Sequence, residues 1–173
     1  MSKQPVIGLR LEPEIAEALR KLAEDNGRDP VEQIVFLITE AVLPFLPPSR
    51  ADWHRLREQV IQRFVGLAQE ITRTEGWRSD IIAETGDRLA ADPAWRADYE
   101  KLIGADAFAK GVKVKDSINP TMGRRTKLRL RAETGKVFAV RQPSIFTSSS
   151  HLHQPSLQNQ AWQTPPEDAW VRK

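Results

Sequence analysis

Residues 6–31 read VIGLRLEPEIAEALRKLAEDNGRDPV, and this stretch decides the fold that the sequence predicts. Residues 6–11 alternate at a period of two, which is typical of a short strand with one apolar face. A helix over about 13–26 and a second helix starting at Pro30 should follow. One strand and two short helices cannot enclose a core alone. The order therefore predicts a homodimer in which two chains pair their strands.

The second helix of this module, from Pro30 to about Phe45, is apolar on nearly every side. Such a helix is expected to be buried against more than one neighbour. Asp29 should cap its N-terminus, and Leu43-Pro44 should end it. The side chains expected to form the core of the dimer are Ile7, Leu9, Leu11, Ile34, Leu37 and Ile38.

The residues Met1–Pro5, Leu9-Arg10 and Arg20–Arg28 resemble the MetJ/Arc ribbon-helix-helix family, and the resemblance covers roughly residues 1–46. It implies a dimeric β-ribbon that enters the DNA major groove through its outward strand side chains. It also implies that the N-terminal end of the second helix faces a DNA phosphate. The expected fold class is thus mainly α, with an N-terminal ribbon-helix-helix, a helical region and a small basic β segment.

This sequence departs from the family pattern at several positions. The outward strand residues are Val6, Gly8 and Arg10, and only Arg10 has a long polar group that can bind a base edge. Asp29 places an anion where the phosphate should lie. The positions that match a buried ion cluster of the family hold Arg28, Gln33 and Leu37, so apolar packing is expected there instead. The module could therefore bind DNA weakly or serve only for dimerisation.

Further helices are expected over about 52–75, 79–90 and 93–103, because apolar residues recur there at spacings of three and four. After Gly111 the pattern changes. Residues 127–131 alternate at a period of two, and 137–140 could form a partner strand. The predicted organisation is a module at 1–46, a helical region at 50–110, a basic β-hairpin-like segment at 111–141 and a flexible tail at 142–173.

Charge is distributed unevenly along the chain. Residues 1–109 hold 14 Lys/Arg and 19 Asp/Glu, whereas residues 110–141 hold ten Lys/Arg and two acids. A polyanion should therefore be drawn to the second region, although a solvated basic surface would look the same. The candidate DNA-binding residues are Lys3, Val6, Gly8, Arg10, Arg28, Lys113, Lys115, Arg124, Arg125, Lys127, Arg129 and Arg131.

Other site chemistry is weakly indicated. The sequence has no cysteine and no run of about 18 apolar residues, and its N-terminus lacks the pattern of a signal peptide. We therefore expect a cytoplasmic protein that is not an enzyme, with no catalytic residues, metal or cofactor. Trp162 and Trp170 lie in the polar tail and could anchor it to a protein partner.

The sequence-based hypothesis is a homodimeric protein that binds double-stranded DNA, as a transcriptional regulator of the phage or mobile-element type. One alternative is a protein-interaction or inhibitor module that uses residues 1–46 for dimerisation. The other is an architectural or relaxosome-type accessory protein that binds DNA with little sequence preference.

Overall fold

The structure is a computed structural model that describes residues 8–140, 144–146 and 148–154. It is mainly helical, with one small antiparallel sheet. The elements in chain order are α1 (Pro13–Asp25), α2 (Pro30–Val42), the 3-10 helix η1 (Leu43–Phe45), α3 (Pro48–Glu75), α4 (Ile81–Ala91), α5 (Pro93–Ile103), α6 (Lys115–Arg129), β1 (Glu133–Ala139) and β2 (Ser148–His153).

The strands lie near the C-terminus, so the expected N-terminal ribbon-helix-helix fold is wrong for this chain. Residues 8–12 belong to no helix or strand, and Val6 and Ile7 lie outside the described residues. A strand needs a hydrogen-bonded neighbour. The only ladder in the described part of the chain joins β1 to β2. An alternating pattern at 6–11 could not by itself supply that neighbour.

The expected basic strand at 127–131 is also wrong, because residues up to Arg129 belong to α6. The buried residues of this helix follow the spacing of one helical face and are, in order, Lys115, Ile118, Thr121, Met122, Arg125 and Thr126. Four of the six are polar or charged, so hydropathy did not reveal the face. Pro120 and Gly123 suggested a turn, yet both lie inside the helix.

The predicted helices upstream are confirmed as α1 to α5, with small shifts of their ends. The predicted cap at Asp29 is also observed, since its carboxylate accepts a hydrogen bond of 2.8 Å from the Glu32 amide. Asp92 caps α5 in the same way, through the Ala94 amide at 2.9 Å. Apolar periodicity and capping residues are local signals, which explains why they identified these helices.

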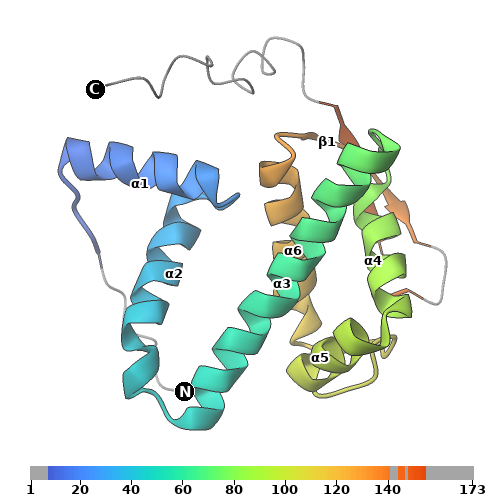
Figure 1. Cartoon of the computed structure of the whole chain (residues 1–173), viewed down its shortest axis with the longest axis horizontal. Coiled ribbons are helices and arrows are strands. Elements are labelled where there is room, and N and C mark those ends of the chain that lie inside the picture. The colour runs from blue at the N-terminus through green and yellow to red at the C-terminus, as the bar shows by residue number, and fades with distance from the viewer. Residues whose placement is uncertain (1–7, 141–143, 147, 155–173) are drawn as a thin grey trace, which may run out of the picture.

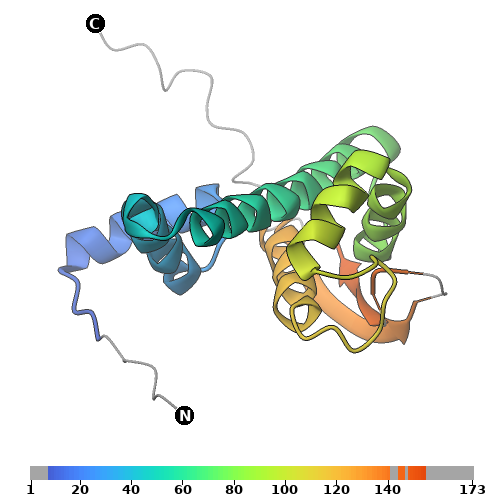
Figure 2. The same cartoon turned by 90° about the horizontal axis from the view of Figure 1, so that it is seen from below.

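The chain forms two regions joined by the long helix α3 (Figures 1 and 2). We call α1, α2, η1 and α3 up to Gln59 the arm, and the rest of the described chain the body. In Figure 1 α1 lies across one end of α2, while α2 and α3 diverge as a V. In Figure 2 the arm projects away from the body. No helix among the described residues is both long and apolar enough to cross a membrane.

The body contains the hydrophobic core, which α3 supplies from Val60 onward. Phe64 is fully buried, and Trp95 stacks on Tyr99 with ring centroids 4.9 Å apart. The Trp95 indole donates to the Val60 carbonyl at 3.2 Å, which ties α5 to α3. The Tyr99 hydroxyl donates to the Asn119 side-chain oxygen at 2.7 Å, which ties α5 to α6.

Part of the segment expected to be a flexible tail belongs to this core. Ile145, Phe146 and Leu152 are buried, and β2 pairs antiparallel with β1. Gly86 on α4 makes room for Phe146, because a Cβ at that position would lie 2.5 Å from the ring. Serine-rich composition concealed the few apolar residues that dock on α4.

Candidate binding surfaces

The arm carries most of the exposed apolar surface of the described residues. Ten of their twelve exposed large hydrophobic residues lie between residues 9 and 45; they are Leu9, Leu11, Ile15, Leu22, Val31, Val35, Leu37, Ile38, Val42 and Phe45. We call these ten residues the arm surface. Large exposed apolar patches are rare on monomeric proteins and mark interaction sites when they occur.

Within the arm surface, α2 presents a continuous apolar stripe. Its members, continued by η1, are Val31, Val35, Ile38, Val42 and Phe45, spaced four, three, four and three residues apart. This is the spacing of the seam between two packed helices. Phe45 is 85% exposed. The only buried residue of α2 is Gln33, so this apolar helix contributes almost nothing to the core of its own chain.

The expected dimer core can be followed residue by residue. Leu9, Leu11, Leu37 and Ile38 are exposed, Ile34 is half-buried, and Ile7 lies outside the described residues. Arg28 and Gln33 are buried and joined by a hydrogen bond of 3.0 Å. The apolar packing expected at Arg28, Gln33 and Leu37 is therefore not what the single chain shows.

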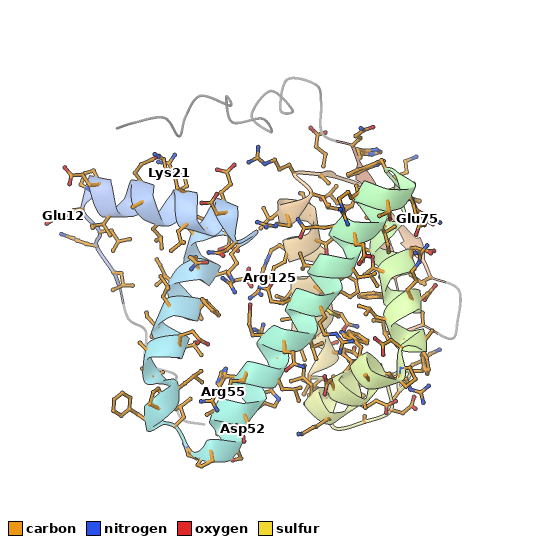
Figure 3. The ribbon with its side chains drawn as sticks, viewed as in Figure 1. Glu12, Lys21, Asp52, Arg55, Glu75 and Arg125 are labelled. Atoms are coloured by element: carbon orange, nitrogen blue, oxygen red, sulfur yellow. The ribbon has the colours of Figure 1, made fainter. Side chains whose placement is uncertain are left out.

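A buried ion cluster joins the arm to the body. Arg125 of α6 donates to Glu32 of α2 at 2.7 Å and to both carboxylate oxygens of Glu58 of α3, at 2.8 and 2.9 Å. Figure 3 shows Arg125 between α2 and α3. Arg28 pairs with the same Glu58 and lies over the Phe36 ring, 3.7 Å from its centroid. Two candidate DNA-binding residues, Arg28 and Arg125, are thus buried in this cluster.

The environment of Glu58 keeps its carboxylate ionised. Burial alone would raise its pKa, but hydrogen bonds from Arg125 and Gln62 and the charges of Arg125 and Arg28 outweigh burial and lower the pKa below its usual value. Removing one member of such a cluster leaves an unpaired buried charge, which is strongly destabilising. The cluster is therefore a structural clamp between the two regions.

Other predicted DNA-binding cations also have partners within the chain. Arg129 donates to the Asp25 carbonyl, and Arg131 pairs with Glu24 at 3.0 Å, so both hold the end of α1. Lys115 is buried, and its ammonium donates to the carbonyls of Ala107 at 2.6 Å and Ala109 at 2.7 Å. Several cations of the basic segment are therefore paired with groups of the same chain.

The remaining candidates are exposed or lie outside the described residues. Gly8 and Arg10 are exposed in the segment that precedes α1, whereas Lys3 and Val6 lie outside the described residues. Lys113 is exposed, Lys127 is half-buried, and Arg124 is exposed with only long ion pairs to Asp29 at 3.7 Å and Glu32 at 3.5 Å. The tail residues Trp162 and Trp170 also lie outside the described residues.

Four basic residues, three of which are candidate DNA-binding residues, line a pocket between α4, α6 and the β-hairpin, with a volume of about 550 Å³. We call it the α6 pocket. Its basic lining residues are Lys110, Lys115, Arg124 and Lys127; its hydroxyl residues include Thr134, Ser148, Ser149 and Ser150; and its apolar lining includes Ile82, Phe108, Ile145 and Phe146. Asp116 is the only acidic residue known to line it. The pocket therefore combines apolar lining residues with positively charged ones.

A second hollow of about 440 Å³ lies between α2, α3 and α6. Val31, Val35 and Phe36 line one side, and Trp53 and Arg57 line the other. It is continuous with the arm surface, because Val31 and Val35 belong to both. Metal chemistry has no support in the described ranges, where no group of three or more His, Cys, Asp or Glu residues could hold an ion.

Comparison with protein-family models, with curated proteins and with solved structures finds no match to this chain. The assignment of function therefore depends on the surfaces alone. Sequence reasoning missed Glu32 and Glu58, the acids that neutralise the basic segment, and the serines at 148–150. The spacing of Ile118 and Met122 was the one available signal that α6 is a helix and that Arg125 lies on its buried side.

Proposed function

We propose that this chain is a homodimeric binding protein whose arm surface forms the dimer. The observation that carries the proposal is the exposed stripe along α2. Exposing five large apolar side chains to water is unfavourable. Burying one side chain of this size fully lowers the free energy by about 1.5–3 kcal/mol. The arm needs an apolar neighbour from another molecule.

A second copy is the occupant that the stripe fits best. Its five positions are all uncharged, so two identical stripes can meet without like-charge repulsion. Their spacing of four and three lets side chains of one helix fit between those of another. Two-fold homodimers are also the commonest soluble assemblies, and they use one patch on both subunits. The interaction proposed here is between helices, and the β1–β2 hairpin takes no part in it.

The test is sedimentation-velocity analysis of the full chain over a range of concentrations. We expect a dimer for the natural sequence and a monomer for Val35→Asp. The matched control is Val137→Asp, which introduces the same charge at an exposed valine of the body: Val35 is 56% and Val137 68% exposed. Circular dichroism should show unchanged helicity in both variants. A monomeric natural chain, or equal effects of the two substitutions, would refute the proposal.

A second candidate function is contact with double-stranded DNA through the body. It is supported by the exposed cations Lys110, Lys113 and Arg124 and the half-buried Lys127, which lie on or near α6. The arm is a poor candidate, because residues 8–46 hold eight acids and four Lys/Arg. A dimer would present two such cationic faces to one duplex, as a regulator or an architectural protein would.

Fluorescence anisotropy with a labelled duplex, measured over a salt series, tests this candidate. If four cations of each chain contact phosphates, the log–log slope of affinity against salt should be about −3.5 per chain. Lys113→Glu should weaken binding, and Arg10→Ala should not. The absence of binding at low salt would eliminate DNA as a ligand. We place this binding role, without catalysis, in the cytoplasm as part of the same proposal.

A further inference from the structure

The α6 pocket has features of a ligand site that neither the dimer nor a DNA contact requires. Its volume of about 550 Å³ falls within the usual range of small-molecule sites, roughly 300–1,000 Å³. Such sites combine an apolar lining with a few polar groups that orient the ligand. The α6 pocket matches this description, with cations at several of its positions.

The wall formed by α6 is shaped by small residues and rigid contacts. Asn119, Pro120 and Gly123 line the pocket, and Gly123 leaves space that a large side chain would fill. Asn119 is held at both ends of its amide: it accepts from the Tyr99 hydroxyl at 2.7 Å and donates to the Ile145 carbonyl at 2.8 Å. This wall is therefore fixed before any ligand arrives, which favours binding.

The basic residues favour an anionic group. Lys110, Arg124 and Lys127 line the pocket with little competition from acids, since Arg124 has only ion pairs of 3.5 and 3.7 Å. Lys115 holds the adjacent loop by binding the carbonyls of Ala107 and Ala109, and it adds a fourth positive charge. Clustered Lys and Arg side chains of this kind suit phosphate oxygens.

The hairpin supplies hydroxyl groups, and one of them has no partner. Ser149 is only 7% exposed, and its Oγ makes no hydrogen bond among the described residues. Buried polar groups are nearly always hydrogen-bonded, so such an atom needs an explanation. Ser149 stands between Ser148 and Ser150, which also line the pocket. The Ser149 Oγ is shielded from solvent, and neighbouring strand side chains point to opposite faces, so the hydroxyl groups that a ligand would meet are those of Ser148 and Ser150.

We propose that the α6 pocket binds a nucleoside monophosphate, with its phosphate held by Lys110, Arg124 and Lys127. The base would lie against the aromatic lining of Phe108 and Phe146, and the ribose hydroxyls would face Ser148 and Ser150 of β2. The apolar, hydroxyl and cationic residues that line this one cavity suit the base, the ribose and the phosphate of such a ligand, respectively. This inference does not depend on the dimer.

Isothermal titration calorimetry of the full chain tests the proposal with AMP, GMP, CMP and UMP. We expect at least one of them to bind with a Kd below about 1 mM. The double variant Lys110→Ala/Lys127→Ala should weaken that binding by about tenfold or more. The control is Lys101→Ala, which removes one charge from an exposed lysine of α5 outside the pocket lining and should change affinity by less than about twofold.

A second pair of variants tests the cavity itself. Gly123→Leu should abolish binding by filling the pocket, and Gly123→Ala should largely preserve it, because its Cβ would meet only Ile82, at an ordinary 3.6 Å. Inorganic phosphate and adenosine should each bind more weakly than the nucleotide. If inorganic phosphate bound as tightly as the nucleotide, the apolar lining would contribute nothing to binding, and the proposal would be overturned.

Two further results would also overturn it: no binding of any of the four nucleotides, or binding that survives both the double lysine variant and Gly123→Leu. A labelled duplex measured in parallel identifies the source of phosphate. If the lysine variants lose only duplex binding, the cations belong to a DNA surface and the pocket proposal fails. Sedimentation of the same samples reports the dimer separately, so failure of one proposal is distinct from failure of the other.

Discussion

The arm and the body distribute apolar residues in opposite ways. In the body Phe64, Trp95 and Tyr99 are fully buried, whereas the arm exposes Phe45, Ile38 and their neighbours. Both regions are helical and both were predicted from apolar periodicity. The difference teaches that periodicity identifies a helix without saying which molecule covers its apolar face. In the body the chain covers itself, and we propose that in the arm a second copy does so.

The largest expected effect is on the free energy of unfolding, when the same substitution, Phe to Ala, is made in the body and in the arm. Phe64→Ala should destabilise the body by about 3–5 kcal/mol, because it leaves a cavity in a packed core. Phe45→Ala should change the unfolding free energy of the monomer by less than about 0.5 kcal/mol. Urea denaturation at low protein concentration, followed by circular dichroism, measures both. Similar losses would show that Phe45 is not an unpartnered residue.

The next effect concerns the clamp between the regions. Glu58→Gln should cost about 3 kcal/mol, since Arg28 and Arg125 would remain buried without their shared carboxylate. Arg55→Gln, at an exposed helical arginine of α3, is the control and should cost little. Denaturation monitored by tryptophan fluorescence measures the change.

The same residue predicts a dependence on pH. The pKa of Glu58 is lowered in the folded state, so its contribution to stability is complete above its usual value of 4.5 and is lost as the pH falls through the lower folded value. The natural chain should therefore lose stability below about pH 4.5 more steeply than Glu58→Gln does. Parallel pH profiles of the two proteins would contradict the assignment.

A smaller effect is expected on association. Phe45→Ala should weaken the dimer by about 2 kcal/mol, or roughly thirtyfold in Kd, if Phe45 lies at the centre of the interface. Leu128→Ala changes an exposed apolar residue of α6 and should leave the dimer unchanged. Sedimentation equilibrium gives both constants. An unchanged constant for Phe45→Ala would move the interface away from η1.

The smallest effects come from two glycines, one in each region. Gly27→Ala should destabilise by about 1 kcal/mol, because its φ is +62° and a Cβ would lie 3.1 Å from Arg129. Gly123→Ala should stabilise by about 0.5–1 kcal/mol, because Gly123 lies in a helix with space for a methyl group. Thermal denaturation compares them, and effects of the same sign would contradict the described backbone.

The extent to which the sequence predicted the structure differs between elements. The starts of α1, α2 and α5 were predictable because Pro13, Asp29 and Asp92 act on the residues next to them. The sheet was misplaced because strands are defined by distant partners: Glu133 pairs with His153, twenty residues later in the sequence. The candidate site was mostly unpredictable, since Glu32 and Glu58 neutralise Arg125 from positions 93 and 67 residues away.

The sequence by itself determined the upstream helices, the excess of charge at 110–141 and the apolar character of α2. These properties depend on neighbours within a few residues. Tertiary structure alone decided which cations remain free, which face of α2 stays uncovered, and that Lys110, Lys127 and Ser149 line one pocket. The physical reason is that burial and ion pairing depend on contacts between residues far apart in the chain. A list of charges cannot show which of them are already neutralised.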